Sequence, residues 1–299
     1  MLKTGKAESP AQRLRELLAG PDLLVMPCAF DALSAKLIEQ AGFKLTFMSG
    51  FAAAASRIGA PDLGLMSYGE VVDHARNMCD ATNIPVLGDG DTGYGNAMNV
   101  QRTVAGLAKA GCAAVMIEDQ LAPKRCGHTP GKEVVRRDEA FDRIKAAVDV
   151  RAAQDLDILL IARTDAAHEL GLDEALERAH EFHRLGAEIL FVEAPQTVAD
   201  MARVGAELPG HTMANLLEGG KTPELSHQEL RDLGFKLAAY PLTLLSAAMK
   251  TMIDTLNLLS ADQPRQDRLL EFAELRQRIG FDEYYEKSAA YASSARDQS

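Results

Sequence analysis

The chain has 299 residues, 47% hydrophobic and 25% charged, and a formal net charge of −11. This length fits one parallel barrel domain, for which about 250 residues are typical. The acidic balance argues against a nucleic-acid surface. No apolar run reaches the roughly 18 residues of a membrane span, and the first residues hold no signal-peptide-like apolar core. The four cysteines are irregularly spaced, so we expect no disulfide or zinc framework and a cytoplasmic protein.

Short apolar runs, each followed by an amphipathic stretch, recur along the chain after a polar leader (residues 1–22) with one short helix, Ala11–Ala19. Most runs lack alternation, which is typical of parallel strands buried on both faces. The predicted strands are Leu23–Phe30, Lys44–Gly50, Ile84–Asp91, Ala113–Asp119, Asp157–Asp165, Glu188–Ala194, His211–Glu218 and Lys236–Leu242.

Eight such units with short connections predict an α/β fold, a closed (β/α)8 TIM barrel over residues 23–259. An open doubly wound sheet is the alternative, but no Gly-x-Gly-x-x-Gly turn follows the first strand. Residues 260–299 are predicted to add a C-terminal helical segment and a polar tail.

Two of the intervening helices carry clear signals. In 31–42, Asp31 is a predicted N-cap, and Leu33, Leu37, Ile38 and Ala41 form the predicted buried stripe. In 171–186 an apolar face recurs at helical spacing and ends at a glycine suited to a C-cap.

Charged and polar residues gather where the predicted strands end. They are Asp89, Asp91, Glu118, Asp119, Arg163, Asp165, Glu193 and Asn215. In a parallel barrel these ends form the active site. Residues two apart in a strand face the same way, so Asp89 and Asp91 are predicted to point at one ion. Clustered carboxylates favour Mg²⁺, with Mn²⁺ as an alternative; Asp119 and Asp165 taken singly also fit turns or helix caps.

A basic loop follows the fourth strand. Lys124-Arg125-Cys126-Gly127-His128 combines two cations, a thiol and an imidazole. Neighbouring cations lower a thiol pKa and suit Cys126 to proton transfer or nucleophilic attack. A solvated basic loop is the other interpretation.

These motifs together resemble the isocitrate lyase/phosphoenolpyruvate mutase superfamily. The resemblance runs from about residue 10 to about residue 286 and rests on five segments in order: DGDTGYG (89–95), IEDQ (117–120), KRCGH (124–128), ARTD (162–165) and NLLEGGKTP (215–223). It implies a barrel with a C-terminal helix exchanged between subunits of a homotetramer.

The resemblance also implies roles for individual residues. Asp91 would bind Mg²⁺ directly, with Asp89, Glu118 and Asp62 in the surrounding metal site. Cys126, His128, Arg163 and Glu193 would act in catalysis. The substrate would be bound by Ser49, Gly50, Phe51, Lys124, Arg125, Gly127, Asn215 and Leu217.

Within the superfamily, the cysteine loop indicates a lyase rather than a mutase. Leu217 stands where methylisocitrate lyases typically carry a threonine that helps hold an extra carboxylate. An apolar residue there favours an alkyl group. The segment around it looks closest to the lyases that cleave 2-alkylmalates such as 2,3-dimethylmalate, among them the petal-death type.

The implied reaction splits a 2-hydroxy dicarboxylate into a 2-oxo acid such as pyruvate and an enediolate, which Cys126 protonates. The alternatives are methylisocitrate cleavage to pyruvate and succinate, oxaloacetate hydrolysis or decarboxylation, and a non-catalytic barrel that binds a dicarboxylate.

Overall fold

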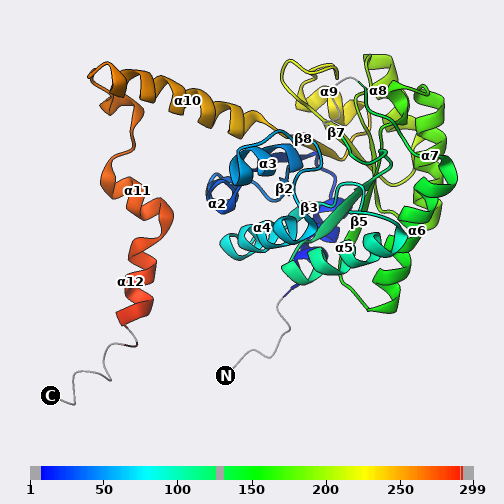
Figure 1. Cartoon of the computed structure of the whole chain (residues 1–299), viewed down its shortest axis with the longest axis horizontal. Coiled ribbons are helices and arrows are strands. Elements are labelled where there is room, and N and C mark those ends of the chain that lie inside the picture. Colours follow the sequence, from blue (N-terminus) through cyan, green and yellow to red (C-terminus); the bar gives the residue numbers. More distant parts are fainter. Residues whose placement is uncertain (1–7, 126–130, 290, 292–299) are drawn as a thin grey trace. The chain divides into compact units, whose positions relative to one another are not determined.

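Eight parallel strands form a closed barrel in the computed structural model, which describes residues 8–125, 131–289 and 291. Each strand pairs with the next, and β8 pairs with β1 (Figure 1). The strands are β1 (Leu24–Ala29), β2 (Thr46–Met48), β3 (Val86–Asp89), β4 (Ala114–Glu118), β5 (Leu159–Thr164), β6 (Ile189–Val192), β7 (His211–Asn215) and β8 (Leu237–Tyr240).

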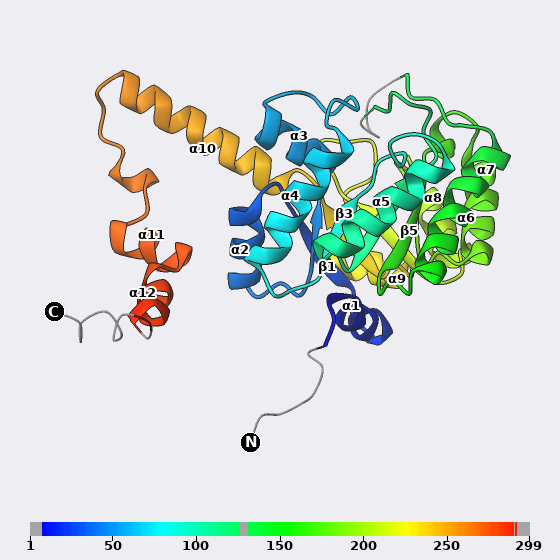
Figure 2. The ribbon, with the colours of Figure 1, turned by 60° about the horizontal axis from the view of Figure 1, so that its bottom comes forward.

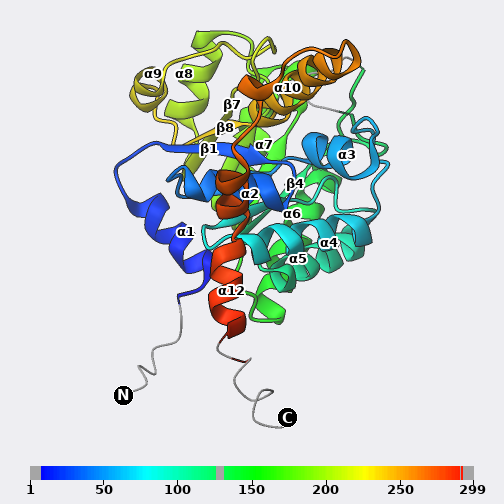
Figure 3. The same cartoon turned by 90° about the vertical axis from the view of Figure 1, so that its left-hand side faces the viewer.

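Helices surround the barrel, and α4 and α5 pack side by side on one flank (Figure 3). The α-helices are α1 (Pro10–Ala19), α2 (Ala32–Gln40), α3 (Gly50–Ile58), α4 (Tyr68–Ala81), α5 (Ala97–Ala110), α6 (Arg137–Ala153), α7 (Leu172–Leu185), α8 (Val198–Glu207), α9 (His227–Asp232), α10 (Thr243–Ser260), α11 (Phe272–Ile279) and α12 (Phe281–Ala289). Two 3-10 helices complete the set, η1 (Ala166–His168) and η2 (Gln266–Arg268).

The strands separate two apolar cores, because successive side chains point to opposite faces. One core lies between the strands and the outer helices. The other fills the barrel and includes Met26, Leu87 and Ile161 together with Leu14 and Leu18 of α1. Helix α1 therefore closes the lower end of the barrel (Figure 2). The candidate active site lies at the opposite end of the barrel, where the strands end.

The predicted barrel and all eight predicted strands are confirmed, although each observed strand is shorter than its apolar run. The N-cap at Asp31 is confirmed by its side chain, which accepts a hydrogen bond from the Ser34 amide. The buried stripe predicted for α2 is mostly wrong: Leu33 and Leu37 are 48% and 37% exposed and Ala41 is exposed as well, while Ile38 is buried.

The chain divides into two compact units, residues 1–245 and 246–299. This division lies near the start of α10, which continues from the first unit into the second, whereas the predicted boundary after residue 259 lies near the end of that helix. On the second unit, Met249, Met252, Ile253, Leu256 and Leu259 are all about half exposed or more and recur at helical spacing. None of the described helices combines the length and apolar character needed to cross a membrane.

Candidate active site

A cavity opens at the carboxyl ends of the strands, and every strand supplies at least one residue to it. The acidic and basic lining residues are Asp62, Asp89, Glu118, Lys124, Arg125, Arg163 and Glu193. The apolar ones include Phe47, Phe51, Met116, Phe191, Met213, Leu217, Ala239, Pro241 and Leu242. The lining thus combines charged side chains with a larger number of apolar ones.

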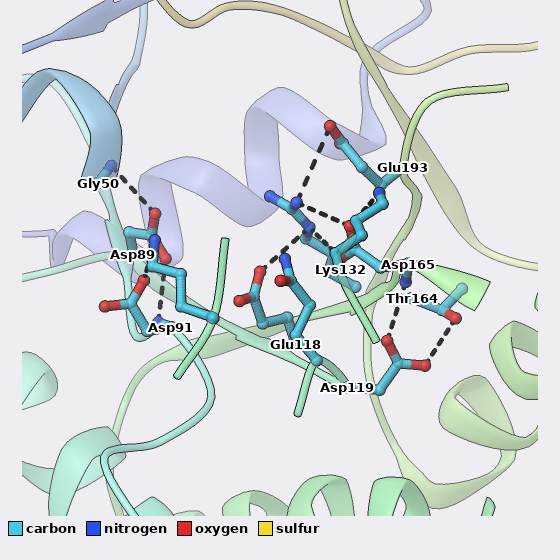
Figure 4. Close-up of polar contacts among 12 residues, drawn as sticks. Gly50, Asp89, Asp91, Glu118, Asp119, Lys132, Thr164, Asp165 and Glu193 are labelled. Carbon is cyan, nitrogen blue, oxygen red and sulfur yellow. Dashed lines mark hydrogen bonds and ion pairs between the residues drawn. The ribbon is translucent and has the colours of Figure 1, made fainter. Parts of the chain in front are cut away.

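Asp89 and Asp91 lie together on one side of the site, with Glu118 across from them (Figure 4). The strand ends at Asp89, and Asp91 sits in the following turn with φ of 48°. The two carboxylates meet through this turn, so our expectation that strand alternation would align them is wrong. Gly90 makes the turn possible, since a Cβ there would lie 2.6 Å from the Met116 carbonyl oxygen.

Backbone amides hold the Asp89 carboxylate. Oδ1 accepts from the Asp91 amide and Oδ2 from the Gly50 amide, each at 3.0 Å. Gly50 permits this approach, because a Cβ there would lie 2.5 Å from Asp89 Oδ2. Asp89 is therefore fixed from both sides before any ligand arrives.

Arg163 lies among carboxylates at the end of β5. Its guanidinium donates two hydrogen bonds to Asp165, from Nε at 2.8 Å and from Nη2 at 3.1 Å. It also forms ion pairs with Glu118 at 3.2 Å and with Glu193 at 3.8 Å. Glu193 in turn accepts a hydrogen bond from the Asn215 amide at 3.4 Å. The structure thus brings together the four predicted site residues Arg163, Glu118, Glu193 and Asn215.

Lys124 reaches into the acidic side of the site from the loop after β4. Its Nζ lies 2.6 Å from Asp62 and 2.7 Å from Asp91 Oδ1. The same loop is anchored by an isolated antiparallel bridge between Gln120 and Val134. Residues 126–130 lie outside the described part of the chain, so the predicted site residues Cys126, Gly127 and His128 are not placed.

Burial perturbs the carboxyl groups of the site. Burial and the neighbouring Asp91 carboxylate raise the pKa of Asp89 to about 6. Burial likewise raises the pKa of Glu118 well above its usual range, and Arg163 offsets this only in part. Burial lowers the pKa of Lys124, but the carboxylates of Asp91 and Asp89 outweigh it and raise that pKa. These shifts indicate that the cationic side chains of the site do not fully compensate its carboxylates.

A divalent cation fits this arrangement. Among the described lining residues, the carboxylates of Asp62, Asp89, Asp91, Glu118 and Glu193 face only the cations Lys124, Arg125 and Arg163, an excess of two negative charges. Glu118 Oε1 is buried and accepts no hydrogen bond within the described chain, and Asp91 Oδ1 is buried in an ion pair with Lys124. A buried oxygen without a hydrogen bond is costly unless an ion or water bonds it.

Among the described residues, no three carboxylate, imidazole or thiol groups converge closely enough to bind one ion together.

The amino end of α3 faces the cavity. Gly50 and Phe51 are its first two residues, and Ser49 is the N-cap, with its hydroxyl accepting from the Ala52 amide. The positive end of a helix is a suitable binding place for a carboxylate. The Gly50 amide is already used by Asp89, which leaves the Phe51 amide and the Ser49 hydroxyl hydrogen on this side.

Two contributors were missed by sequence reasoning. Lys132 is fully buried and donates to Asp165 at 2.6 Å, so Asp165 is the centre of an ion-pair group (Figure 4) rather than a helix cap. Tyr94 donates to Asp91 Oδ2 at 2.9 Å. The Tyr94 position was visible in the motif DGDTGYG, whereas nothing local to Lys132 indicates a partner 33 residues away.

Comparisons with known proteins agree with this site. The family model described as phosphoenolpyruvate phosphomutase matches residues 14–259. A 2,3-dimethylmalate lyase of Eubacterium barkeri is 41% identical over 94% of this chain and 98% of its own length. A probable 2-methylisocitrate lyase of Corynebacterium glutamicum is 43% identical, covering 81% of this chain and 79% of the relative. A solved structure of oxaloacetate acetylhydrolase with an inhibitor has a TM-score of 0.90 at 33% identity, covering 96% and 98% of the two chains.

Proposed function

Because the chain belongs to the phosphoenolpyruvate mutase/isocitrate lyase superfamily, we propose that it cleaves a 2-alkylmalate such as 2,3-dimethylmalate in a Mg²⁺-dependent reaction. It is a carbon–carbon lyase. The observation that carries the substrate proposal is the mixed lining of the cavity, which combines carboxylates, including the buried and unbonded Glu118 Oε1, with apolar side chains. The carboxylates suit a cation with a hydroxy acid, and the apolar side chains suit an alkyl substituent.

The metal would be held by Asp91 directly, with Asp89, Glu118 and Asp62 bonding its waters. Mn²⁺ is the alternative ion for such a set of oxygen ligands. When bound, a divalent cation supplies Lewis-acid stabilisation of negative charge on the substrate oxygens. Lys124 would then give up its contact with Asp91 Oδ1, since both bond the same oxygen.

Substrate carboxylates would be bound at two places. The Phe51 amide and the Ser49 hydroxyl, at the amino end of α3, would hold one of them. Arg163 would hold the other, oriented by its bidentate contact with Asp165. Lys124 and Arg125 would add positive charge from the loop. Leu217, with Phe47 and Met213 of the same cavity lining, would contact the alkyl group.

Bond cleavage needs a proton donor. As the 2-hydroxyl loses its proton, the C2–C3 electron pair passes to the departing fragment, and pyruvate and an enediolate form. The Cys126 thiol would donate its proton to C3 of this enediolate, with His128 and Gly127 on the same loop segment completing the surroundings. Cys126 follows Arg125, which lines the cavity. Cys126→Ala should therefore lower kcat far more than substrate affinity.

A panel of dicarboxylates tests the substrate. Malate, 2-methylmalate, 2,3-dimethylmalate, methylisocitrate, isocitrate and oxaloacetate are each incubated with Mg²⁺, and pyruvate, succinate and oxalate are measured. We expect pyruvate without succinate, fastest from 2,3-dimethylmalate. Pyruvate with succinate from methylisocitrate as the best substrate would support that lyase instead. Formation of oxalate from oxaloacetate, above the level in a blank with metal alone, would support oxaloacetate hydrolysis. A solved structure similar to this chain is an oxaloacetate acetylhydrolase.

The assembly is the second part of the proposal. An apolar groove on the outside of the barrel is lined by Val25, Pro27, Leu37, Phe43 and Tyr240, and the exposed stripe of α10 needs a similar cover. We expect a homotetramer in which C-terminal helices of one subunit cover such a groove on another. The three cysteines in the described part of the chain are unpaired. This agrees with a reducing compartment, so we assign the enzyme to the cytoplasm.

A further inference from the structure

The two carboxylate oxygens of Asp91 have different surroundings. Oδ2 accepts a hydrogen bond from the Tyr94 hydroxyl at 2.9 Å. Oδ1 accepts no hydrogen bond within the described residues and lies 2.7 Å from Lys124 Nζ in an ion pair. Oδ2 is thus hydrogen-bonded to the protein, and Oδ1 is the oxygen available to a cation.

Tyr94 is held in place by the turn and by its neighbours. Its backbone is left-handed, with φ of 61°, a conformation that non-glycine residues rarely adopt. Its ring packs edge-on against Tyr68, with centroids 6.2 Å apart. Tyr68 is itself covered by the Arg102 guanidinium, 4.3 Å from its ring centre. The hydroxyl therefore has little freedom to leave Asp91.

We propose that Tyr94 makes Asp91 a one-oxygen ligand and so selects Mg²⁺ against Ca²⁺. The inference rests on the proposed function, which places the metal at Asp91. Mg²⁺ requires an octahedron of single oxygens at 2.0–2.1 Å, whereas Ca²⁺ takes six to eight oxygens at 2.3–2.6 Å, often with both oxygens of one carboxylate. A hydrogen bond to Oδ2 obstructs the second mode and leaves the first unaffected.

Asp89 reinforces the same preference. Both of its oxygens accept backbone amide hydrogen bonds, from Asp91 and Gly50, so it too is a poor two-oxygen ligand. Tyr94 would act through its hydrogen bond to Asp91. Its role in this inference is to determine metal specificity and not to take part in the reaction.

Calorimetry on the metal-free full chain tests the inference. The protein is titrated with MgCl2 and with CaCl2 as unaltered protein, as Tyr94→Phe and as Tyr68→Phe. The last is a matched control, because it removes a hydroxyl from the neighbouring ring, which bonds the Arg102 carbonyl and not Asp91. Circular dichroism and melting curves establish that each variant is folded.

We expect the unaltered protein to bind Mg²⁺ at least about tenfold more tightly than Ca²⁺. Tyr94→Phe should reduce this ratio by about tenfold, because the freed Oδ2 can then bond Ca²⁺ as a second oxygen, and Tyr68→Phe should leave it unchanged. An unchanged ratio in Tyr94→Phe, or equal binding of the two ions by the unaltered protein, overturns the inference alone. No Mg²⁺ binding by the unaltered protein overturns the proposed function and the inference with it.

Discussion

The buried pair between Lys132 and Asp165 gives a stability prediction with a built-in control. Both side chains are fully buried, and Nζ lies 2.6 Å from Oδ1. Lys145 and Asp149 form a pair at the same 2.6 Å, but these side chains are 60% and 51% exposed. The N–O distance is therefore the same in the two pairs, while the burial of the side chains differs strongly.

Lys132→Met leaves a buried carboxylate with one cation fewer. Removing one partner of a buried ion pair costs about 3–5 kcal/mol. Asp165 keeps its two hydrogen bonds from Arg163, so we expect a loss near the lower end, about 3 kcal/mol. For a chain of this size that corresponds to a fall in Tm of about 6–12 °C. Lys145→Met should change Tm by no more than about 1 °C, because exposed pairs contribute little.

The stability of both variants is measured by urea and thermal unfolding followed by circular dichroism. Asp165→Asn and the double variant Lys132→Met/Asp165→Asn complete a double-mutant cycle. The double variant should cost less than the sum of the single ones, by about 2 kcal/mol, because the two residues contact each other. A Tm for Lys132→Met within about 2 °C of that for Lys145→Met would refute the reasoning that burial decides the strength of this pair.

Three further predictions concern specificity, pH and assembly. Leu217→Thr should raise kcat/KM for methylisocitrate relative to 2,3-dimethylmalate by about tenfold; an unchanged ratio would remove the reason for preferring alkylmalates. Burial lowers the pKa of His74, so the unfolded state takes up a proton first and stability should fall as the pH drops below about 6.5; His74→Gln should flatten that slope in urea midpoints. Leu256→Arg, on the exposed stripe of α10, should dissociate the proposed tetramer in light scattering, and a tetramer that stays intact in this variant would exclude this face from the interface.

The fold could be predicted because its signals are local. A strand buried on both faces must be apolar along its length, so each of the eight strands can be predicted from its own segment of sequence. The cap at Asp31 and the C-cap at Gly186 are likewise set by neighbouring residues. Most of the charged site residues were predictable for the same reason, since parallel strands bring their ends to one mouth.

The parts that were missed depend on tertiary structure. Leu33 and Leu37 fit an apolar helical pattern, but the sequence of α2 does not determine which surface covers these side chains. Asp91 joins Asp89 through a left-handed turn that strand periodicity does not describe. Lys132 meets Asp165 only after β4 and β5 are paired in the barrel. Ion pairs between distant segments become visible only in coordinates.

Metal-dependent product release tests the central claim most directly. Pyruvate formation from 2,3-dimethylmalate is followed in EDTA, after addition of excess Mg²⁺, and in Asp91→Ala with the same Mg²⁺. We predict no turnover in EDTA, recovery with Mg²⁺ and no recovery in Asp91→Ala. Full activity in EDTA, or an Asp91→Ala enzyme as active as the unaltered one, would contradict the account.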